Sequence, residues 1–428
     1  MDFIRIYGGT PLFGQVEIQG SKNCILPLIA ASVLFSEEIE LVGCPEISDI
    51  DEMLSIFKDI GGIWRKKDKH LFLDGSQVND GNLSIPKENA ATLRASILFM
   101  GELAGRTGKA VMHSPVGCAI GKRPIDIHIE MMKKTGFLYH EESDFFTVQK
   151  RSVSIHTVEE YEYKIPISSV GVSENAIMAA VLGKNRRTVL KNIALEPEIA
   201  ALCNMLNLGG AKIYGIGTGS LLIEGVERLG RLTFYVPRDR IVAGTYAIAG
   251  MATGGIVELV HAPYSEIQAL LQVLKSMGAM IEKQEDVLTV IAPKVPGRLP
   301  YLMTAPYPGF PTDLQSQMMV LLTQSLYPSV LHETIFENRF RIADELKKMG
   351  ADIYPDEQEN RLCIRGGNKL AGCKVHAKEL RGGAALVIAG EIASGMTELY
   401  NTHFIKRGYE DIVRDMKSLG ANISLESE

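Results

Sequence analysis

The stretch SPVGCAIGKRPIDIH, residues 114–128, places a thiol beside two cations. Its two prolines and two glycines disfavour a regular helix or strand and predict a surface loop, where reactive groups are commonly found. Lys122 and Arg123 would stabilise a thiolate at Cys118, which makes this cysteine a usable acid or nucleophile near neutral pH. The spacing alone fits equally well a cysteine that is tucked under the loop and has no catalytic role.

A second candidate is the lysine in GSKNCILPLIAASVL, residues 20–34. Lys22 and Asn23 come immediately before an apolar segment that predicts a helix. Backbone N–H groups and the dipole at the start of a helix favour an anion, so a lysine there suits a phosphate or a carboxylate. Taken alone, the stretch also fits a solvated lysine beside an ordinary N-cap, which is the more common arrangement.

Three more segments place cations where an anion could bind. Arg94 in TLRASILFMGELAG and Arg381 in ELRGGAALVIAG each lead a long apolar stretch. An arginine at the start of a buried helix needs a partner, which is either a structural carboxylate, the more common case, or a bound anion. Arg407 in FIKRGYEDI stands with Lys406 before a glycine turn, and this pair fits an anion clamp or a solvated surface equally well.

One carboxylate stands out in the proline-rich stretch TAPYPGFPTDLQSQ, residues 304–317. Asp313 immediately precedes a predicted helix, and an N-cap is its expected role there. A cap that also faces a cleft can serve as a general base.

Two glycine-containing stretches do not indicate a nucleotide-binding loop. GIGTGS, residues 215–220, predicts a hairpin turn and no dinucleotide loop, and GKRP has no upstream phosphate-loop glycine.

The elements that must position these residues follow an internal repeat. An amphipathic helix, a small-residue stop and a short apolar strand recur six times, as MLSIFKDIGGIW, IEMMKKTGFLY, LCNMLNLGGAKIY, LQVLKSMGAMIE, ADELKKMGADIY and VRDMKSLGANISL. The aligned glycines are Gly61, Gly136, Gly210, Gly278, Gly350 and Gly420. Each is expected to end its helix in the left-handed conformation. Short β runs such as VEIQG, LFLDG and VLTVIA fill the rest, and the apolar helices are expected to pack inside walls of sheet.

Composition limits the class of protein. A chain of 428 residues predicts two domains, and a net charge of −6 argues against coating nucleic acid or an anionic membrane. The six cysteines lie far apart without a C-x-x-C pair or zinc-like histidine spacing, so we expect no structural metal. The start of the sequence has neither the basic residues nor the apolar run of a signal peptide, and we expect a reduced, cytoplasmic protein.

Nine motifs in order carry a resemblance to a known family: GSKN, RASI, GCAIGKRPIDIH, EPEI, IEGVERL, TAPYPGFPTD, TIFENRF, ELRGGAAL and RGYE. Together they resemble the bacterial UDP-N-acetylglucosamine enolpyruvyl transferases, from about residue 3 to the C-terminus. The resemblance implies an α/β fold in which two domains each pack three βαβαββ-type units as an inside-out barrel, with helices within. It implies one domain over 22–236, the other over 1–21 and 237–428, and an active site in the cleft between them.

The resemblance also implies a reaction. Members of this family transfer the enolpyruvyl group of phosphoenolpyruvate to the 3′-hydroxyl of UDP-N-acetylglucosamine and release phosphate through a tetrahedral intermediate, as the first committed step of peptidoglycan synthesis. Cys118 then matches the loop cysteine that takes part in proton transfer and product release, and that fosfomycin alkylates. Asp313 matches the carboxylate proposed to accept the hydroxyl proton.

Binding roles follow from the same resemblance. The phosphoenolpyruvate clamp comprises Lys22, Arg123 and Arg407, with Arg94, Arg381 and Cys118 in the same cleft, and Lys22 and Arg407 also count as catalytic. The UDP-N-acetylglucosamine contacts comprise Asn23, Arg94, Arg123, Pro124, Ile125, Asp126, His128, Ser169, Val170, Gly171, Asp313, Ile335 and Arg339. The two small-molecule substrates are the only partners expected, with no metal, cofactor, nucleic acid or membrane.

Three positions depart from the family pattern. Val116 replaces a glycine before Cys118, Val242 in PRDRIVAGT stands where a glutamate is common, and Glu379 replaces an aspartate before Arg381. Two alternatives therefore stay open. One is a transferase with another acceptor, such as the shikimate-phosphate branch, although its NAGTA signature is absent. The other is a non-catalytic paralogue that binds a UDP-sugar as a sensor or regulator.

Overall fold

The structure is a computed structural model of the chain, and it describes residues 2–78, 94–113, 125–143, 145–152, 158–356 and 358–427. Only the backbone is described at residues 94 and 95. The described residues divide into two compact units. The central unit lies within residues 20–237, and the terminal unit consists of residues 2–19 and 238–427. Each unit has a hydrophobic core of its own.

Each unit repeats one arrangement three times, and each repeat has two helices. The first helices are α1 (Lys22–Ala31), α4 (Phe99–Thr107), α6 (Val170–Val181), α8 (Arg240–Thr253), α10 (Gln315–Thr323) and α12 (Leu380–Ile392). The second helices are α2 (Ser48–Asp59), α5 (Asp126–Lys134), α7 (Pro197–Leu208), α9 (Gln268–Ser276), α11 (Ala343–Lys348) and α13 (Ile412–Ser418). Every residue of α8 and α12 except the last is buried, because each packs against its neighbours on all sides.

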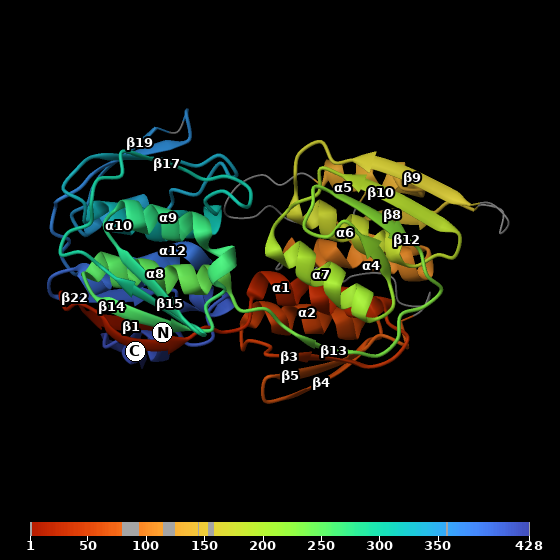
Figure 1. The fold of residues 1–428 in the computed structure, drawn as a ribbon, viewed down its shortest axis with the longest axis horizontal. Coiled ribbons are helices and arrows are strands. Elements are labelled where there is room, and N and C mark those ends of the chain that lie inside the picture. Colours follow the sequence, from red (N-terminus) through yellow and green to blue (C-terminus); the bar gives the residue numbers. More distant parts are fainter. Residues whose placement is uncertain are drawn as a thin grey trace. The chain divides into compact units, whose positions relative to one another are not determined.

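The strands form the outer layer of each unit (Figure 1). The sheets of the central unit are β13 (Thr233–Tyr235), β3 (Ile39–Val42), β5 (His70–Asp74) and β4 (Ile63–Lys67); β9 (Glu159–Lys164), β10 (Arg186–Lys191), β12 (Ser220–Glu224) and β11 (Lys212–Tyr214); and β6 (Lys109–His113), β8 (Phe145–Lys150) and β7 (Phe137–Glu141). The hairpin of β11 and β12 contains the GIGTGS stretch, as predicted.

The terminal unit has three four-stranded sheets among its described residues. They are β2 (Phe13–Glu17), β14 (Ile256–Val260), β16 (Val287–Ile291) and β15 (Met280–Gln284); β17 (Tyr301–Met303), β18 (Ser329–His332), β20 (Arg361–Arg365) and β19 (Asp352–Asp356); and β21 (Lys374–His376), β22 (Met396–Tyr400), β1 (Asp2–Tyr7) and β23 (Asn422–Ser427). The first two strands of each sheet are parallel and the others antiparallel. The N-terminal strand β1 therefore lies beside the C-terminal strand β23 (Figure 1).

The six aligned glycines end the second helices as the sequence predicted. All six have a positive φ, between 89° at Gly420 and 107° at Gly210. A residue with a Cβ atom pays a steric cost in this region, whereas glycine does not. The same helix, glycine and strand therefore recur in each repeat, and the prediction of six units with helices inside sheet is confirmed.

No helix in the described ranges has both the length and the apolar character needed to cross a membrane.

Glu391 in α12 gives the terminal unit an expected pH dependence. Its side chain is buried, and its Oε1 atom has no hydrogen-bond partner among the described residues. Burial raises the pKa of this carboxyl group to about 8, from an ordinary value of 4.5. The folded chain therefore keeps a proton that the unfolded chain releases between these pH values. Since the unfolded state binds fewer protons there, the free energy of unfolding falls as the pH rises, by up to about 1.4 kcal/mol per pH unit.

Glu391→Gln removes this titration while keeping the size of the side chain. We expect the variant to unfold with a flatter pH dependence and to be more stable than the parent near the upper end of that window. Urea unfolding between about pH 5 and pH 8 measures both effects, and Glu282→Gln on the exposed face of β15 is the matched control. Parallel pH profiles of the parent and Glu391→Gln would contradict this role for burial.

Candidate active site

Asp313 lies between two buried arginines in the terminal unit. It belongs to a short 3₁₀ helix, η4 (Thr312–Leu314), which immediately precedes α10. Its Oδ1 accepts a hydrogen bond from Arg339 Nη2 at 2.5 Å, and its Oδ2 accepts one from Arg381 Nη2 at 2.9 Å. The two arginine side chains are only 3% and 4% exposed. The expected N-cap role of Asp313 is wrong: the N-cap of α10 is Leu314, and the carboxylate turns to the arginines instead.

The charges around Asp313 decide its ionisation. Burial raises the pKa of this carboxyl group, but the positive charges of Arg381 and Arg339, and more weakly of Arg240, outweigh burial and hold the pKa well below its usual range. For Arg381, burial lowers the pKa, but the charge of Asp313 more than compensates and the net shift is upward. Asp313 and Arg381 therefore both stay charged near neutral pH.

Both arginines keep unused donors. Nη1 of Arg381 and Nε of Arg339 are buried and have no hydrogen-bond partner among the described residues. Leaving a buried donor of a charged group unpaired is costly, about 1–3 kcal/mol or more. A small anion or an acceptor-rich ligand that supplied oxygen atoms here would remove that cost, so the arrangement suits an anion-binding site.

Glu379 fixes the start of the helix that carries Arg381. It is the N-cap of α12, and its carboxylate accepts hydrogen bonds from the backbone N–H groups of Arg381 and Gly382. Its Oε2 also lies 3.8 Å from Arg339 Nη1. The longer side chain at this departure from the family pattern thus still caps the helix and faces the arginine pair.

Glu333 connects Ile335 to the Asp313 segment. Its Oε2 accepts a hydrogen bond from the hydroxyl of Thr312 at 2.9 Å, and its Oε1 accepts from the backbone N–H of Ile335 at 2.8 Å. The Glu333 side chain is buried, whereas Ile335 is 37% exposed. The structure therefore brings Ile335, Arg339, Asp313 and Arg381 into one neighbourhood of the terminal unit.

The segment that carries Arg407 has two anchors in this unit. Arg407 ends the 3₁₀ helix η5 (Thr402–Arg407). The buried carboxamide of Gln19 donates to the C=O of Gly408 at 3.2 Å and accepts from the N–H of Glu410 at 2.9 Å. Between these contacts, the buried hydroxyl of Tyr409 bonds to Thr245 and lies beside Arg381.

Lys22 is paired with a carboxylate in the central unit. It is the first residue of α1, so it lies inside the helix that it was expected to precede, and Ser21 is the N-cap. Its Nζ lies 2.6 Å from Oδ2 of Asp49 in the first turn of α2. The side chains are 11% and 1% exposed. Asn23 follows Lys22 in the first turn of α1.

Residues assigned to the sugar nucleotide meet in another part of the central unit. Ile125 is the N-cap of α5, Asp126 begins this helix, and His128 is buried within its first turn. Ser169 is the N-cap of α6, followed by Val170 and Gly171. A Cβ atom added at Gly171 would lie 3.5 Å from Cε1 of His128, so the two segments are in contact.

Other predicted residues lie partly or wholly outside the described part of the chain. Arg94 begins the 3₁₀ helix η2 (Arg94–Leu98), but its side chain is not described, and Cys118, Arg123, Pro124 and Val116 lie outside the described residues. The third departure from the family pattern, Val242 in PRDRIVAGT, leaves the start of α8 regularly capped. Asp239 accepts hydrogen bonds from the backbone N–H groups of Ile241 and Val242. Val242 is fully buried in the apolar core, where its side chain needs no polar partner.

The sequence did not single out four residues that hold predicted site residues within their own units: Asp49 and Asn175 in the central unit, and Gln19 and Glu333 in the terminal unit. Each is buried and each binds a segment that carries a predicted site residue. The available signal was a polar residue inside or beside an apolar stretch, as for Asn175 in VGVSENAIMAAV. Such a residue needs a hydrogen-bond partner, but the spacing does not reveal which residue that partner is.

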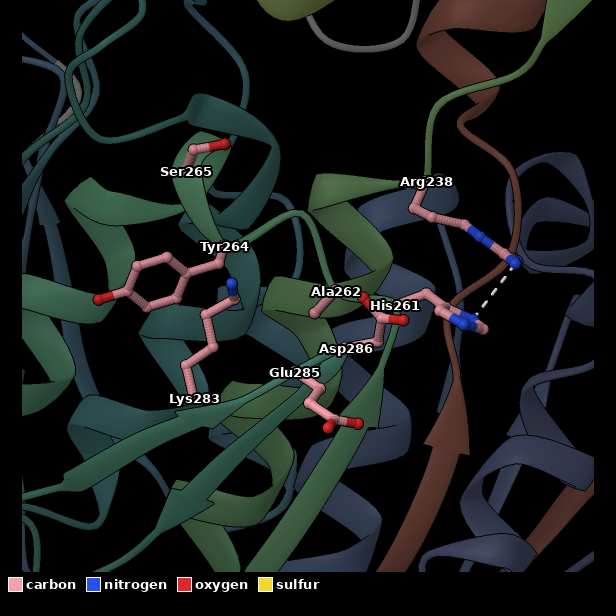
Figure 2. A pocket seen from close by; sticks show the side chains of 8 residues that line it. All are labelled: Arg238, His261, Ala262, Tyr264, Ser265, Lys283, Glu285 and Asp286. Atoms are coloured by element: carbon pink, nitrogen blue, oxygen red, sulfur yellow. Dashed lines mark hydrogen bonds between the residues drawn. The ribbon is translucent and has the colours of Figure 1, made fainter.

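A pocket of about 430 Å³ in the terminal unit contains none of the predicted site residues. Figure 2 shows its lining side chains, which are Arg238, His261, Ala262, Tyr264, Ser265, Lys283, Glu285 and Asp286. Nη2 of Arg238 donates to Nδ1 of His261 at 3.3 Å and also bonds to Glu17 at 3.0 Å. The charged groups of this pocket are of both signs, so it offers no concentrated field for an anion.

Comparison with solved structures identifies the fold. The enolpyruvyl transferase NikO from Streptomyces tendae superposes with a TM-score of 0.87 at 22% identity, covering 100% of this chain and 99% of that one. EPSP synthase from Acinetobacter baumannii superposes with a TM-score of 0.73 at 17% identity, covering 100% of both chains. At these identities the likeness concerns the fold, which is that of the enolpyruvyl transferases.

Sequence comparison gives the family. The family described as EPSP synthase (3-phosphoshikimate 1-carboxyvinyltransferase) matches residues 6–416. UDP-N-acetylglucosamine 1-carboxyvinyltransferase 2 of Caldanaerobacter subterraneus is 40% identical over 427 residues, 99% of each chain. UDP-N-acetylglucosamine 1-carboxyvinyltransferase of Thermotoga maritima is 38% identical, over 99% of this chain and 98% of the relative. The chain belongs to the enolpyruvyl (1-carboxyvinyl) transferase family.

Proposed function

We propose that this protein transfers the enolpyruvyl group of phosphoenolpyruvate to the 3′-hydroxyl of UDP-N-acetylglucosamine, as the first committed step of peptidoglycan synthesis. The hydroxyl oxygen adds to C2 of phosphoenolpyruvate while C3 gains a proton, which gives a tetrahedral intermediate. Loss of a proton from C3 and departure of phosphate then restore the double bond. Full-length relatives that carry this name support the acceptor. In this proposal the reaction takes place in the cytoplasm.

The observation that carries the proposal is the arginine pair at Asp313. Two buried guanidinium groups share one carboxylate and retain unpaired N–H donors, as an anionic substrate would require. In this proposal Arg381, Lys22, Arg94, Arg123 and Arg407 bind the phosphate and carboxylate of phosphoenolpyruvate. Because these donors are fixed in place before the reaction, they do not have to reorganise in order to stabilise the charge that shifts during addition.

Asp313 accepts the proton of the attacking hydroxyl in this proposal. Its low pKa makes the free carboxylate a weak base, because two guanidinium groups stabilise the charged form. Phosphoenolpyruvate bound at Arg381 would compete for that guanidinium and weaken its hold on Asp313. Substrate binding would then raise the pKa of the carboxyl group toward the range where a general base is effective.

Cys118 supplies the proton for C3 in the same proposal, and the remaining predicted residues bind the sugar nucleotide. These are Asn23, Arg94, Arg123, Pro124, Ile125, Asp126, His128, Ser169, Val170, Gly171, Asp313, Ile335 and Arg339. We further propose that the domains span 22–236, and 1–21 with 237–428, and that both supply residues to one reaction.

An acceptor comparison tests this function. Purified protein is supplied with phosphoenolpyruvate and either UDP-N-acetylglucosamine, shikimate 3-phosphate or no acceptor, and released phosphate is measured. We expect release with the UDP-sugar alone. Release with shikimate 3-phosphate would assign the chain to the other branch of the family, and UDP-sugar binding in calorimetry without any phosphate release would favour a regulatory paralogue.

Gln19 offers a separate prediction about the Arg407 segment. Gln19→Leu removes both hydrogen bonds to the backbone around Tyr409, so the segment that carries Arg407 is held less firmly. We expect the KM for phosphoenolpyruvate to rise on the order of 10-fold to 100-fold, since small displacements of a positioning group have effects of this size. Steady-state kinetics measure this KM, with Gln15→Leu on β2 as the matched control, because the Gln15 side chain bonds to the exposed Glu258. An unchanged KM would show that this anchor does not position Arg407.

A further inference from the structure

The buried carboxamide of Asn175, in the middle of α6, has a fixed orientation. Its Oδ1 accepts a hydrogen bond from the backbone N–H of Gly101 at 2.7 Å, and its Nδ2 donates to the backbone C=O of Ile97 at 3.1 Å. Exchanging the two ends of the amide would place donor against donor and acceptor against acceptor. Nδ2 is therefore a hydrogen-bond donor at this position.

The same nitrogen meets the ring of His128. Nδ2 of Asn175 lies 3.2 Å from Nδ1 of His128. An amide nitrogen can only donate, so Nδ1 must be the acceptor and cannot carry a hydrogen atom. In a neutral imidazole the hydrogen then resides on the other ring nitrogen, Nε2. The C=O of Gly171, 3.3 Å from Nδ2, is a third and slightly more distant acceptor of the two amide hydrogens.

We propose that Asn175 is a positioning residue that holds His128 as the Nε2–H tautomer, so that this ring offers a hydrogen-bond donor to an oxygen acceptor of the bound nucleotide. The inference rests on the proposed function, which assigns His128 to the UDP-sugar. An added Cβ atom at Gly171 would lie 3.7 Å from Nε2, so the donor edge of the ring borders the Ser169–Gly171 segment assigned to the same ligand. The acceptor is a diphosphate oxygen or a uracil carbonyl oxygen, which offer the same chemistry.

The first test observes the tautomer directly. ¹⁵N chemical shifts of the histidine rings in the ligand-free protein distinguish Nε2–H from Nδ1–H, and the spectrum of His128→Gln assigns the signal of His128. We expect the Nε2–H form. A hydrogen atom on Nδ1 in the parent protein would overturn the inference without any substitution at Asn175.

The second test changes the amide. Asn175→Asp replaces the donor with an acceptor of the same shape, so we expect His128 to move its hydrogen atom to Nδ1 and UDP to bind about 10-fold to 100-fold more weakly, as for loss of one hydrogen bond. Asn207→Asp is the matched control in the same unit, because the Asn207 carboxamide also bonds at both ends to backbone, at Ile213. Unchanged UDP affinity together with an unchanged tautomer in a folded Asn175→Asp variant would overturn the role.

The choice of probe distinguishes a diphosphate acceptor from a uracil acceptor. It also distinguishes a failure of the His128 contact from a failure of the proposed transferase activity. Calorimetry with UDP and with uridine, on the parent and His128→Gln, assigns the contact to phosphate if only UDP binding weakens, and to uracil if both weaken. Neither probe losing affinity would overturn the ligand contact. Because these measurements need no turnover, UDP binding that depends on His128 would stand even if the phosphate-release assay rejected the transferase.

Discussion

Asp313→Glu is expected to lower kcat by about 10²-fold to 10⁴-fold while the protein keeps its stability. The glutamate retains the negative charge between Arg339 and Arg381, but it moves the carboxylate by one methylene group from the position that a general base must occupy. Steady-state phosphate release gives kcat, and urea unfolding gives the stability of the same preparation. A kcat within twofold of the parent would contradict the assignment of Asp313 as the base.

Asp313→Asn separates the structural role from the catalytic one. It removes the charge that two nearly buried guanidinium groups share, and breaking such a pair costs about 3–5 kcal/mol. We expect about 3 kcal/mol, the low end, because Asp313 is itself 23% exposed and solvent screens part of the effect. Asp356→Asn, at the exposed end of β19, is the control for loss of one carboxylate from this unit.

Lys22→Met is the second substitution with a large expected effect. Removing a fixed donor that stabilises a developing anion commonly costs about 10²-fold to 10³-fold in rate, and we expect kcat/KM for phosphoenolpyruvate to fall by this amount. The variant also leaves Asp49, only 1% exposed, without the lysine that faces it, so the central unit should lose stability as well. The single variant therefore cannot tell an anion-binding lysine from a structural one.

The double variant Lys22→Met with Asp49→Asn makes that distinction. Neutralising both partners removes the buried negative charge that the single variant leaves without its lysine, so we expect stability to recover toward that of the parent. Binding of phosphoenolpyruvate should stay weak if Lys22 holds the substrate. Recovery of activity together with stability would mean that Lys22 acts only as the structural partner of Asp49. Lys58→Ala, on the exposed side of α2, controls for loss of one positive charge.

The repeats were predictable because their signals are local. A glycine after an amphipathic helix reports the backbone conformation of that residue alone, and all six aligned glycines adopt it. The same holds for the apolar helices α8 and α12, whose burial follows from their own composition. The need of Arg381 for a partner was also a local inference, and a carboxylate, Asp313, meets it.

The pairings were not predictable, because partners far apart in sequence leave no mark in local spacing. Gln19 bonds to Gly408, 389 positions away, and Asn175 meets His128 across 47 positions. Asp313 shows the same limit: its position before a helix predicts a cap, but two arginines from distant segments attract the carboxylate more strongly than the N–H groups of the helix. Charge pairs set by tertiary packing therefore override a preference that the local sequence expresses.

The most direct test of the proposed enolpyruvyl transfer identifies the products of one reaction. Purified protein is incubated with phosphoenolpyruvate and UDP-N-acetylglucosamine, and the nucleotides are separated by anion exchange and identified by mass spectrometry. We expect one phosphate to be released for each UDP-sugar that gains an enolpyruvyl ether, and none from either substrate alone. An unaltered UDP-sugar after incubation with stoichiometric enzyme would contradict the proposed transfer.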